Sequence, residues 1–244
     1  MLIEELRERW WKKVKENGLE NAIVKVRRLS PAEAIGKPAP ARDFPLRRGQ
    51  EVLLQAELKS FSGQAFTDEP PTYYEGDLQS IYNLSLDTNR NRAIFIASAN
   101  ATYRYLGLIT NTVHCRDKGP EACAKEAAQY LTSILPSNAK LLMIGYQPAF
   151  TYHISKSFKN FRVTDMNSSN IGQVKDGVLI ESYEANREAI GWGQAVFATG
   201  TSIVNNTIDE IISLSRGKKL IFYGVTIAAA AYEFGFTRVC FESF

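Results

Sequence analysis

The second half of the chain alternates short apolar segments with helical ones, and this alternation constrains the fold more than any other feature. From residue 140 onward, apolar runs at 141–144, 161–164, 195–198 and 219–223 each precede a helical pattern. Strands that are apolar throughout, rather than at every second position, are typical of a parallel sheet covered on both faces. The pattern predicts a doubly wound α/β sheet for this half of the chain.

The first half shows a different pattern, which predicts a smaller α+β domain. Apolar residues recur every four positions from Leu2 to Val14 and predict a helix over 2–16. Further strands are expected at 22–29 and 51–59, and further helices at 77–84 and 93–106. The polar, turn-rich segment 62–68 predicts a loop, either closing over a cleft or lying on the surface. We expect domain boundaries of 1–110 and 111–244.

The composition is that of a globular cytoplasmic protein. The 244 residues include 29 Lys and Arg against 26 Asp and Glu, a net charge of +3, and the basic residues are scattered rather than grouped as a nucleic-acid surface requires. The N-terminus is charged from Glu4 and no apolar run approaches the ~20 residues of a membrane span. Three cysteines without a regular framework favour free thiols and a reducing compartment.

Several predicted strands end in a turn residue, and these ends predict a ligand site. Gly145, Asp165, Gly200 and Gly224 each follow a strand. Ligands of open α/β sheets bind beyond the carboxyl ends of the strands. Asp165 lies twenty residues after Gly145, the spacing of an acid that holds a ribose hydroxyl, although the glycine-rich pyrophosphate fingerprint is absent. Asn170, in the loop after Asp165, and Thr226, after Gly224, are further candidates.

The segment Thr199-Gly200-Thr201 precedes a predicted helix over 202–215. Free N–H groups and the dipole at a helix start favour an anionic ligand. Threonine and serine at this place also serve as simple caps. Capping does not explain Asn205 and Asn206 within the helix, where asparagine is unfavourable. We therefore predict that Thr199, Gly200, Thr201, Asn205 and Asn206 contact a ligand.

His114 and Cys115, with Cys123 eight residues further on, form the only histidine–cysteine cluster of the sequence. Imidazole and thiolate are ligands for zinc and copper. The spacing is not that of a zinc finger, so a structural histidine and two buried thiols are the alternative. Trp10 and Trp11 are adjacent on one helix and cannot face the same core, which predicts a homodimer through that helix.

The segment 198–210 (ATGTSIVNNTIDE) and the segment 221–231 (IFYGVTIAAAA) resemble the bacterial and archaeal family described as "putative heavy-metal chelation". The segments 142–148, 163–165 and 97–101 are also similar to parts of this family. The resemblance implies an enolase-N-terminal-like domain packed on a Rossmann-like domain, with a cleft between them. It also implies a role in binding a metal chelate or in cofactor metabolism.

These observations support three hypotheses. The first is a protein that binds a small anionic molecule or a metal chelate in an interdomain cleft, with a transition metal held by Asp165, His114 or Cys115. The second is an enzyme that uses a nucleoside-containing cofactor such as S-adenosylmethionine, whose ribose Asp165 would hold. The third is a non-catalytic scaffold, which the absence of a recognisable acid–base pair or triad favours.

Overall fold

The computed structural model describes residues 1–38, 44 and 51–244. The elements of the first half are α1 (Leu2–Glu16), β1 (Ile23–Arg28), α2 (Pro31–Ile35), β2 (Val52–Leu58), β3 (Phe61–Thr67), β4 (Tyr73–Asp77), α4 (Leu78–Tyr82) and α5 (Asn89–Tyr105). The expected helices and strands of this half are present. The exception is the segment 62–68, which lies largely in the strand β3 rather than in a loop.

The elements of the second half are α6 (Gly119–Ile134), β5 (Lys140–Ile144), α7 (Pro148–Ser155), β6 (Asn160–Asp165), β7 (Val174–Lys175), β8 (Val178–Ser182), η1 (Tyr183–Ala185), α8 (Asn186–Trp192), β9 (Ala195–Thr199), η2 (Gly200–Ile203), α9 (Ile208–Leu214), β10 (Lys219–Tyr223), α10 (Ala228–Phe234) and β11 (Thr237–Val239). The predicted alternation of strands and helices is confirmed. The expected helix over 202–215 is wrong, because η2 and α9 are separated by a turn.

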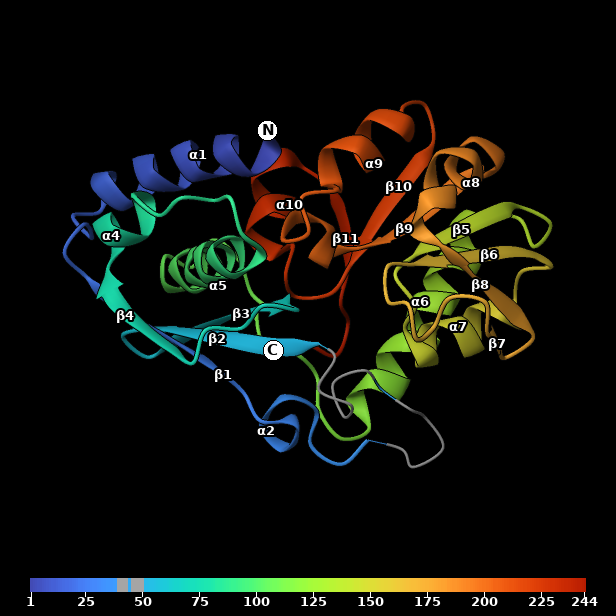
Figure 1. Cartoon of the computed structure of the whole chain (residues 1–244), viewed down its shortest axis with the longest axis horizontal. Helices are drawn as coiled ribbons and strands as arrows, with labels where there is room; N and C mark the ends of the chain where they lie inside the picture. The colour runs from blue at the N-terminus through green and yellow to red at the C-terminus, as the bar shows by residue number, and fades with distance from the viewer. Residues whose placement is uncertain (39–43, 45–50) are drawn as a thin grey trace.

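The strands form two sheets within the described residues (Figure 1). An antiparallel sheet has the order β3-β2-β1-β4, and a second sheet has the order β11-β10-β9-β5-β6-β8-β7. The second sheet is parallel apart from β7, which pairs antiparallel with β8. The predicted α/β class, a parallel sheet beside a separate antiparallel one, is therefore confirmed. The boundary at residue 110 stays a prediction.

The parallel sheet is wound in the order of a Rossmann fold. Its chain begins at β5 in the middle, runs outward through β6 and β8, and returns to β9 on the other side of β5 before continuing to β10 and β11. The direction of winding reverses between β5 and β9, which are hydrogen-bonded neighbours. At such a switch point the loops after the two strands diverge and leave a crevice.

Alternate residues of the central strands enter two separate cores. Leu142 and Ile144 of β5 face a core that also contains side chains of α1, α5, α9 and α10. Leu141 and Met143 face the opposite core, which α6 and α7 cover. The first core joins one face of the parallel sheet to α5 and the antiparallel sheet, so the two sheets are held together by continuous apolar packing.

The helix α5 packs close to β3 at Gly63. This contact explains why the strand β3 contains a glycine, although glycine in the segment 62–68 favours a loop. A Cβ atom on Gly63 would lie 2.1 Å from the backbone nitrogen of Ala101 and 2.5 Å from the carbonyl oxygen of Ala97. Small residues on both elements are needed for this contact. Hydrogen bonds from β3 to β2, in register from Phe61 to Thr67, complete the strand.

The adjacent tryptophans of α1 are both accommodated within the chain. Trp10 is buried in the first core, and Trp11 stacks on Tyr82 of α4 with ring centroids 4.7 Å apart. The observation that suggested a dimer therefore has an intramolecular explanation, and the dimer stays a prediction. In the part of the chain that the structure describes, no helix is both long enough and apolar enough to span a membrane.

Candidate ligand-binding pocket

A pocket of about 400 Å³ opens at the carboxyl ends of the parallel strands. Residues that follow β5, β6, β9 and β10 form one wall, and the end of β3 with the loop before α6 forms the other. The pocket therefore lies at the switch point of the parallel sheet and against the antiparallel sheet. The turn residues at the strand ends predict a ligand site at this edge of the sheet.

Most of the residues expected at the site line this pocket. They are His114, Cys115, Gly145, Asp165, Thr199, Thr201, Asn205, Gly224 and Thr226. Asn170, Gly200 and Asn206 are not in the lining. Asn170 is buried behind Asp165, and Gly200 packs on Ile227, whose Cβ would lie 2.7 Å from a Cβ at position 200. Contact of any of these residues with a ligand stays a prediction.

The carboxylate of Asp165 accepts three hydrogen bonds from neighbouring residues. Its Oδ2 accepts hydrogen bonds from the backbone N–H of Tyr146 at 2.9 Å and from Asn170 Nδ2 at 3.2 Å. Its Oδ1 accepts one from the backbone N–H of Asn167 at 2.7 Å. Burial raises the pKa of Asp165 above its ordinary value, and these donors offset part of that rise. The carboxylate thus joins the loops that follow β5 and β6.

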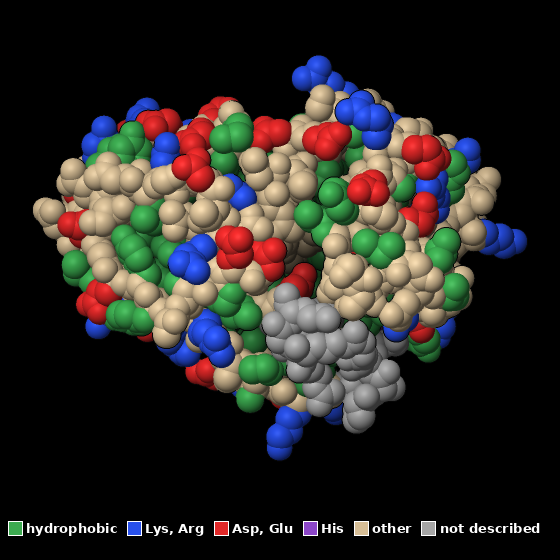
Figure 2. All heavy atoms as spheres, in the orientation of Figure 1, with side chains coloured by type: hydrophobic (Ala, Val, Ile, Leu, Met, Phe, Trp, Pro, Cys, Tyr) green, Lys and Arg blue, Asp and Glu red, His purple; other side chains and the backbone are tan. Residues whose placement is uncertain are grey.

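Two more carboxyl groups face the same space. Glu51, which precedes β2, and Asp68, which follows β3, line the pocket together with Asp165. Desolvation inside the pocket, with the nearby charges of Asp165 and Asp68, raises the pKa of Glu51 to about 7, although much of the Glu51 side chain is open to solvent. Figure 2 shows acidic side chains gathered along the hollow between the two halves of the molecule.

The described lining contains no lysine or arginine. A free anion would therefore face three carboxyl groups, with no lysine or arginine among the described lining residues to balance their charge. The short η2 (Gly200–Ile203) that follows Thr199 does not supply the long helix start on which the expectation of an anionic ligand depends. The electrostatics instead favour a ligand that carries positive charge, such as a metal ion with its own organic ligands.

The backbone conformation of the chain explains the asparagine at position 206 but not the one at position 205. Asn206 adopts a left-handed conformation with φ of 59°, which breaks the helix between η2 and α9. Asparagine tolerates this conformation better than most residues. Asn205 lies in the same turn and lines the pocket, where its Nδ2 is 3.7 Å from Met166 Sδ. The placement of both residues in the first turns of a helix was wrong.

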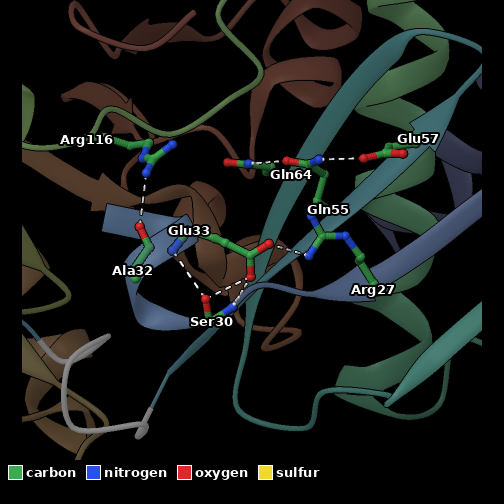
Figure 3. A network of polar contacts seen from close by, with 8 residues as sticks. All are labelled: Arg27, Ser30, Ala32, Glu33, Gln55, Glu57, Gln64 and Arg116. Atoms are coloured by element: carbon green, nitrogen blue, oxygen red, sulfur yellow. Dashed lines mark hydrogen bonds and ion pairs between the residues drawn. The ribbon is translucent and has the colours of Figure 1, made fainter. Parts of the chain in front are cut away.

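His114 is held in the pocket wall through its backbone. Its N–H donates to Gln64 Oε1 at 2.7 Å, and Gln64 Nε2 donates to Gln55 Oε1 at 2.8 Å. Gln55 in turn donates to Glu57, as Figure 3 shows. Burial lowers the pKa of His114 to about 4, so the imidazole is neutral, and its buried Nδ1 has no hydrogen-bond partner among the residues that the structure describes.

The three cysteines of the chain meet at the pocket. Cys115 from the loop before α6, Cys123 from α6 and Cys240 after β11 all line it, and all are free thiols. Cys115 and Cys123 are buried, and Cys240 is half-buried. The sequence grouped Cys115 with Cys123, but nothing local indicated that Cys240 joins them across 117 residues.

A bare metal ion does not fit the side chains alone. Among residues 1–38, 44 and 51–244, no three histidine, cysteine, aspartate or glutamate side chains surround a common point at which they would hold an ion. Structural metal sites in proteins usually need four such ligands, and catalytic sites three. Any metal bound in this pocket must therefore bring further ligands with it.

Sequence reasoning missed Glu51, Tyr223 and Cys240. Tyr223 closes the pocket floor, where its hydroxyl donates to the carbonyl oxygen of Gly145 at 2.6 Å. Tyr223 is the last residue of β10 and Cys240 follows the last residue of β11, so the rule that predicted the other strand ends would have included both. Glu51 carries no comparable signal in the sequence.

Comparison with protein families supports the resemblance found in the sequence. Residues 130–240 match the model of the family DUF364, described as "Putative heavy-metal chelation". The match covers the parallel sheet from the end of α6 to β11. The comparison with curated proteins found no match.

Two solved structures share the fold. A protein of unknown function from the DUF364 family of Pyrococcus horikoshii has a TM-score of 0.56 and 15% identity, covering 93% of this chain and 80% of that one. A protein of unknown function from the same family of Desulfitobacterium hafniense has a TM-score of 0.52 and 13% identity, covering 75% of this chain and 73% of that one. At these identities the likeness concerns the fold alone.

Proposed function

We propose that the chain binds a small metal chelate, that is, an organic ligand with its own metal ion, in the pocket between the two sheets. The observation that carries the proposal is the charge of the lining: Glu51, Asp68 and Asp165 face a space without a described cationic side chain. A metal ion within the ligand supplies the positive charge that these carboxyl groups favour.

The placement of the side chains that could coordinate a metal supports a chelate rather than a bare ion as the ligand. The described side chains do not offer three ligands to one point, so most coordination positions must be filled by the small molecule. The lining also includes apolar and aromatic side chains, with Phe66, Phe150 and Ile144 among them. Such walls suit the organic part of the ligand and exclude water from it.

The family description agrees with this proposal and adds the class of metal. The words "heavy-metal chelation" describe the family that residues 130–240 match. Their transfer to this chain is part of the proposal, and the charge of the pocket supports it independently.

A nucleoside cofactor is the second candidate, because Asp165 ends the strand next to β5 at the switch point. However, each oxygen of Asp165 already accepts a hydrogen bond from the loops beside it. This leaves fewer lone pairs for two ribose hydroxyls. A scaffold without a ligand is the weakest candidate, since it gives no account of a pocket lined by three carboxyl groups.

Calorimetric titration and thermal unfolding with Zn²⁺, Ni²⁺ and Co²⁺, each alone and each as its cationic complex with the tetraamine cyclen, test the proposal. We expect the complexes to bind and to raise the melting temperature more than the ions alone or cyclen alone do. Glu51→Gln and Asp68→Asn should weaken this binding, whereas Glu16→Gln, on the exposed side of α1, should not. Binding of adenosine-bearing cofactors without binding of any complex would favour the second candidate.

A further inference from the structure

We propose that the organic part of the bound chelate is an amine-type ligand, whose N–H groups donate hydrogen bonds to the hydroxyl of Ser202 and to the carboxyl groups of Asp68 and Glu51. This inference rests on the proposed function and deepens it, because it names the chemical class of the chelator. It also places Ser202, which lines the pocket, among the residues that contact the ligand.

The hydroxyl of Ser202 is a buried polar group without an internal partner. Ser202 lines the pocket and is 2% exposed, and its Oγ has no hydrogen bond to any residue that the structure describes. Buried hydroxyl groups in folded proteins are mostly hydrogen-bonded, because leaving such a bond unmade costs free energy. A ligand in the pocket can supply the missing partner.

The backbone of Ser202 is held in place by the turn that follows it. Its carbonyl oxygen accepts hydrogen bonds from the N–H of Thr207 at 3.0 Å and from the Thr207 hydroxyl at 3.4 Å. Another buried serine, Ser215, also has a hydroxyl without a partner among the described residues, but it lies outside the described lining of the pocket. Of these two serines, only Ser202 is placed where a pocket ligand can reach it.

The carboxyl group of Asp68 has an acceptor position left for a ligand. Its Oδ1 accepts a hydrogen bond from Asn89 Nδ2 at 2.8 Å, which orients the side chain and leaves Oδ2 for a further donor. By contrast, both oxygens of Asp165 accept hydrogen bonds from the residues around them. Asp68 and Glu51 therefore provide the acceptors for the ligand, and Asp165 adds negative charge to the same lining.

The positive charge of an amine-type ligand matches the electrostatics of the lining. No lysine or arginine is among the described lining residues, and the imidazole of His114 is neutral because burial lowers its pKa to about 4. Desolvation and the charges of Asp165 and Asp68 raise the pKa of Glu51 to about 7. An N–H group on an ammonium or on a metal-bound amine stabilises the ionised carboxyl groups through charge-assisted hydrogen bonds.

Aromatic rings in the lining favour the same class of ligand. Phe66 of β3, Phe150 of α7 and Tyr223 of β10 line the pocket. The rings of Phe150 and Tyr223 pack against each other with their centroids 4.9 Å apart. Aromatic rings attract cations and contact the methylene groups of an amine chelator. A carboxylate-type chelator would instead bring its own negative charge against Glu51 and Asp68.

Calorimetric titration of the full chain with three Zn²⁺ complexes tests the inference. The cyclen complex is doubly positive and carries N–H groups, the complex with N-tetramethylated cyclen has the same charge without N–H groups, and the EDTA complex is an anion of the carboxylate type. We expect the cyclen complex to bind roughly tenfold or more tightly than the methylated one, the size of a charge-assisted hydrogen bond. The EDTA complex should not bind.

Two serine variants test the contact separately from the stability of the fold. Ser202→Ala and Ser215→Ala each remove a buried hydroxyl without a described partner, so both should keep or raise the melting temperature of the unliganded chain. Only Ser202→Ala should weaken binding of the cyclen complex, by roughly three- to tenfold, and it should leave the affinity for the methylated complex unchanged. Asp68→Asn, which keeps an oxygen for Asn89, should also narrow the difference between these two complexes and decides the test if Ser202→Ala does not fold.

The outcomes separate this inference from the function on which it rests. Equal affinity for the cyclen and methylated complexes, unchanged binding in Ser202→Ala, or binding of the EDTA complex instead overturns the amine contact, and the chelate-binding function stands. If metal-free cyclen binds as tightly as its complex, the chelate-binding function is contradicted and the amine class stands. If neither the complexes nor metal-free cyclen bind, both proposals fail.

Discussion

The hydroxyl of Thr226 accepts a hydrogen bond from the backbone N–H of Phe66 at 3.1 Å, and this bond joins the two sheets beside the pocket. Phe66 belongs to β3, and Thr226 follows β10, 160 residues later. Thr226 is 2% exposed. A side chain expected at the site from its position after a strand thus also fixes the relative placement of the two pocket walls.

Replacement of Thr226 by valine keeps the shape and removes the acceptor. The N–H of Phe66 then has no partner beside the pocket, so we expect the free energy of unfolding to fall by about 1–2 kcal/mol. Urea denaturation measures the change. Thr226→Ser retains the hydroxyl and should stay within about 1 kcal/mol of the original chain. A larger loss in Thr226→Ser than in Thr226→Val would show that the methyl group, rather than the hydrogen bond, matters.

The side chain of Asn100 also joins separate elements of the fold, through more hydrogen bonds than Thr226 makes. Its Nδ2 donates to the carbonyl oxygens of Gln64, Val225 and Thr226, and its Oδ1 accepts from the backbone N–H of Ala229 at 2.8 Å. The residue is fully buried in the middle of α5. One side chain thereby satisfies backbone groups of β3 and of the segment before α10.

We expect Asn100→Leu to lower the free energy of unfolding by about 3 kcal/mol or more, because several buried backbone groups lose their partner together. Thermal and urea unfolding measure the loss. The matched control is Ser98→Ala on the same helix, since Ser98 is equally buried but its hydroxyl donates to the carbonyl oxygen of Ile94 in its own helix. That variant should lose about 1 kcal/mol or less, and a similar loss in both would refute the connecting role of Asn100.

Comparison of sequence and structure shows which parts of the site were predictable. Gly145, Asp165 and Gly224 were identified because an apolar strand and the turn residue after it are local features. The meeting of Cys240 with Cys123, and of Glu51 with Asp165, depends on how the sheets pack, which no local pattern encodes.

Two predicted elements, the loop over 62–68 and the helix over 202–215, differ from the structure, and each difference has a specific cause. The turn-forming residues of segment 62–68 predict a loop, yet the close approach of Ala101 on α5 requires glycine at position 63 of a strand. In the segment 202–215, Val204, Ile208 and Ile211 keep helical spacing across a break at Asn206. Apolar periodicity reports which side faces the core and does not detect a single left-handed residue.

Gly145 and Gly224 form a matched pair for a third prediction. Both have a positive φ, 92° and 95°. A Cβ on Gly145 would lie 2.8 Å from Thr199 Cγ2 and 2.9 Å from the Tyr223 hydroxyl, whereas a Cβ on Gly224 would meet open space. Gly145→Ala therefore adds steric overlap to the conformational cost, and Gly224→Ala carries the conformational cost alone.

We expect Gly224→Ala to lose about 1–2 kcal/mol of stability and Gly145→Ala to lose about 1–3 kcal/mol more, the usual cost of overpacking. Unfolding in urea measures both. Gly145→Ala should also weaken binding of the cationic cyclen complexes beyond its effect on stability, because Thr199 and Tyr223 line the pocket. Equal stabilities would mean that Thr199 and Tyr223 move aside without cost.

The carboxyl group of Glu51 provides the last prediction, which concerns pH. Its pKa in the folded chain is about 7, above the ordinary value of 4.5, because of desolvation and the charges of Asp165 and Asp68. The folded state therefore holds this proton more tightly than the unfolded state does. Stability associated with the group is fully present below about pH 4.5 and is lost as the pH rises through about 7.

Glu51→Gln removes this titration, so the stability of the variant relative to the original chain should increase between about pH 5 and pH 8. Since much of the Glu51 side chain is open to solvent, we expect a relative gain of about 1 kcal/mol rather than the full amount that the pKa implies. Urea denaturation of both proteins across this range measures it, with Glu16→Gln as the exposed control. A difference that does not change with pH would show that Glu51 ionises normally and that the carboxyl groups of the pocket do not repel one another.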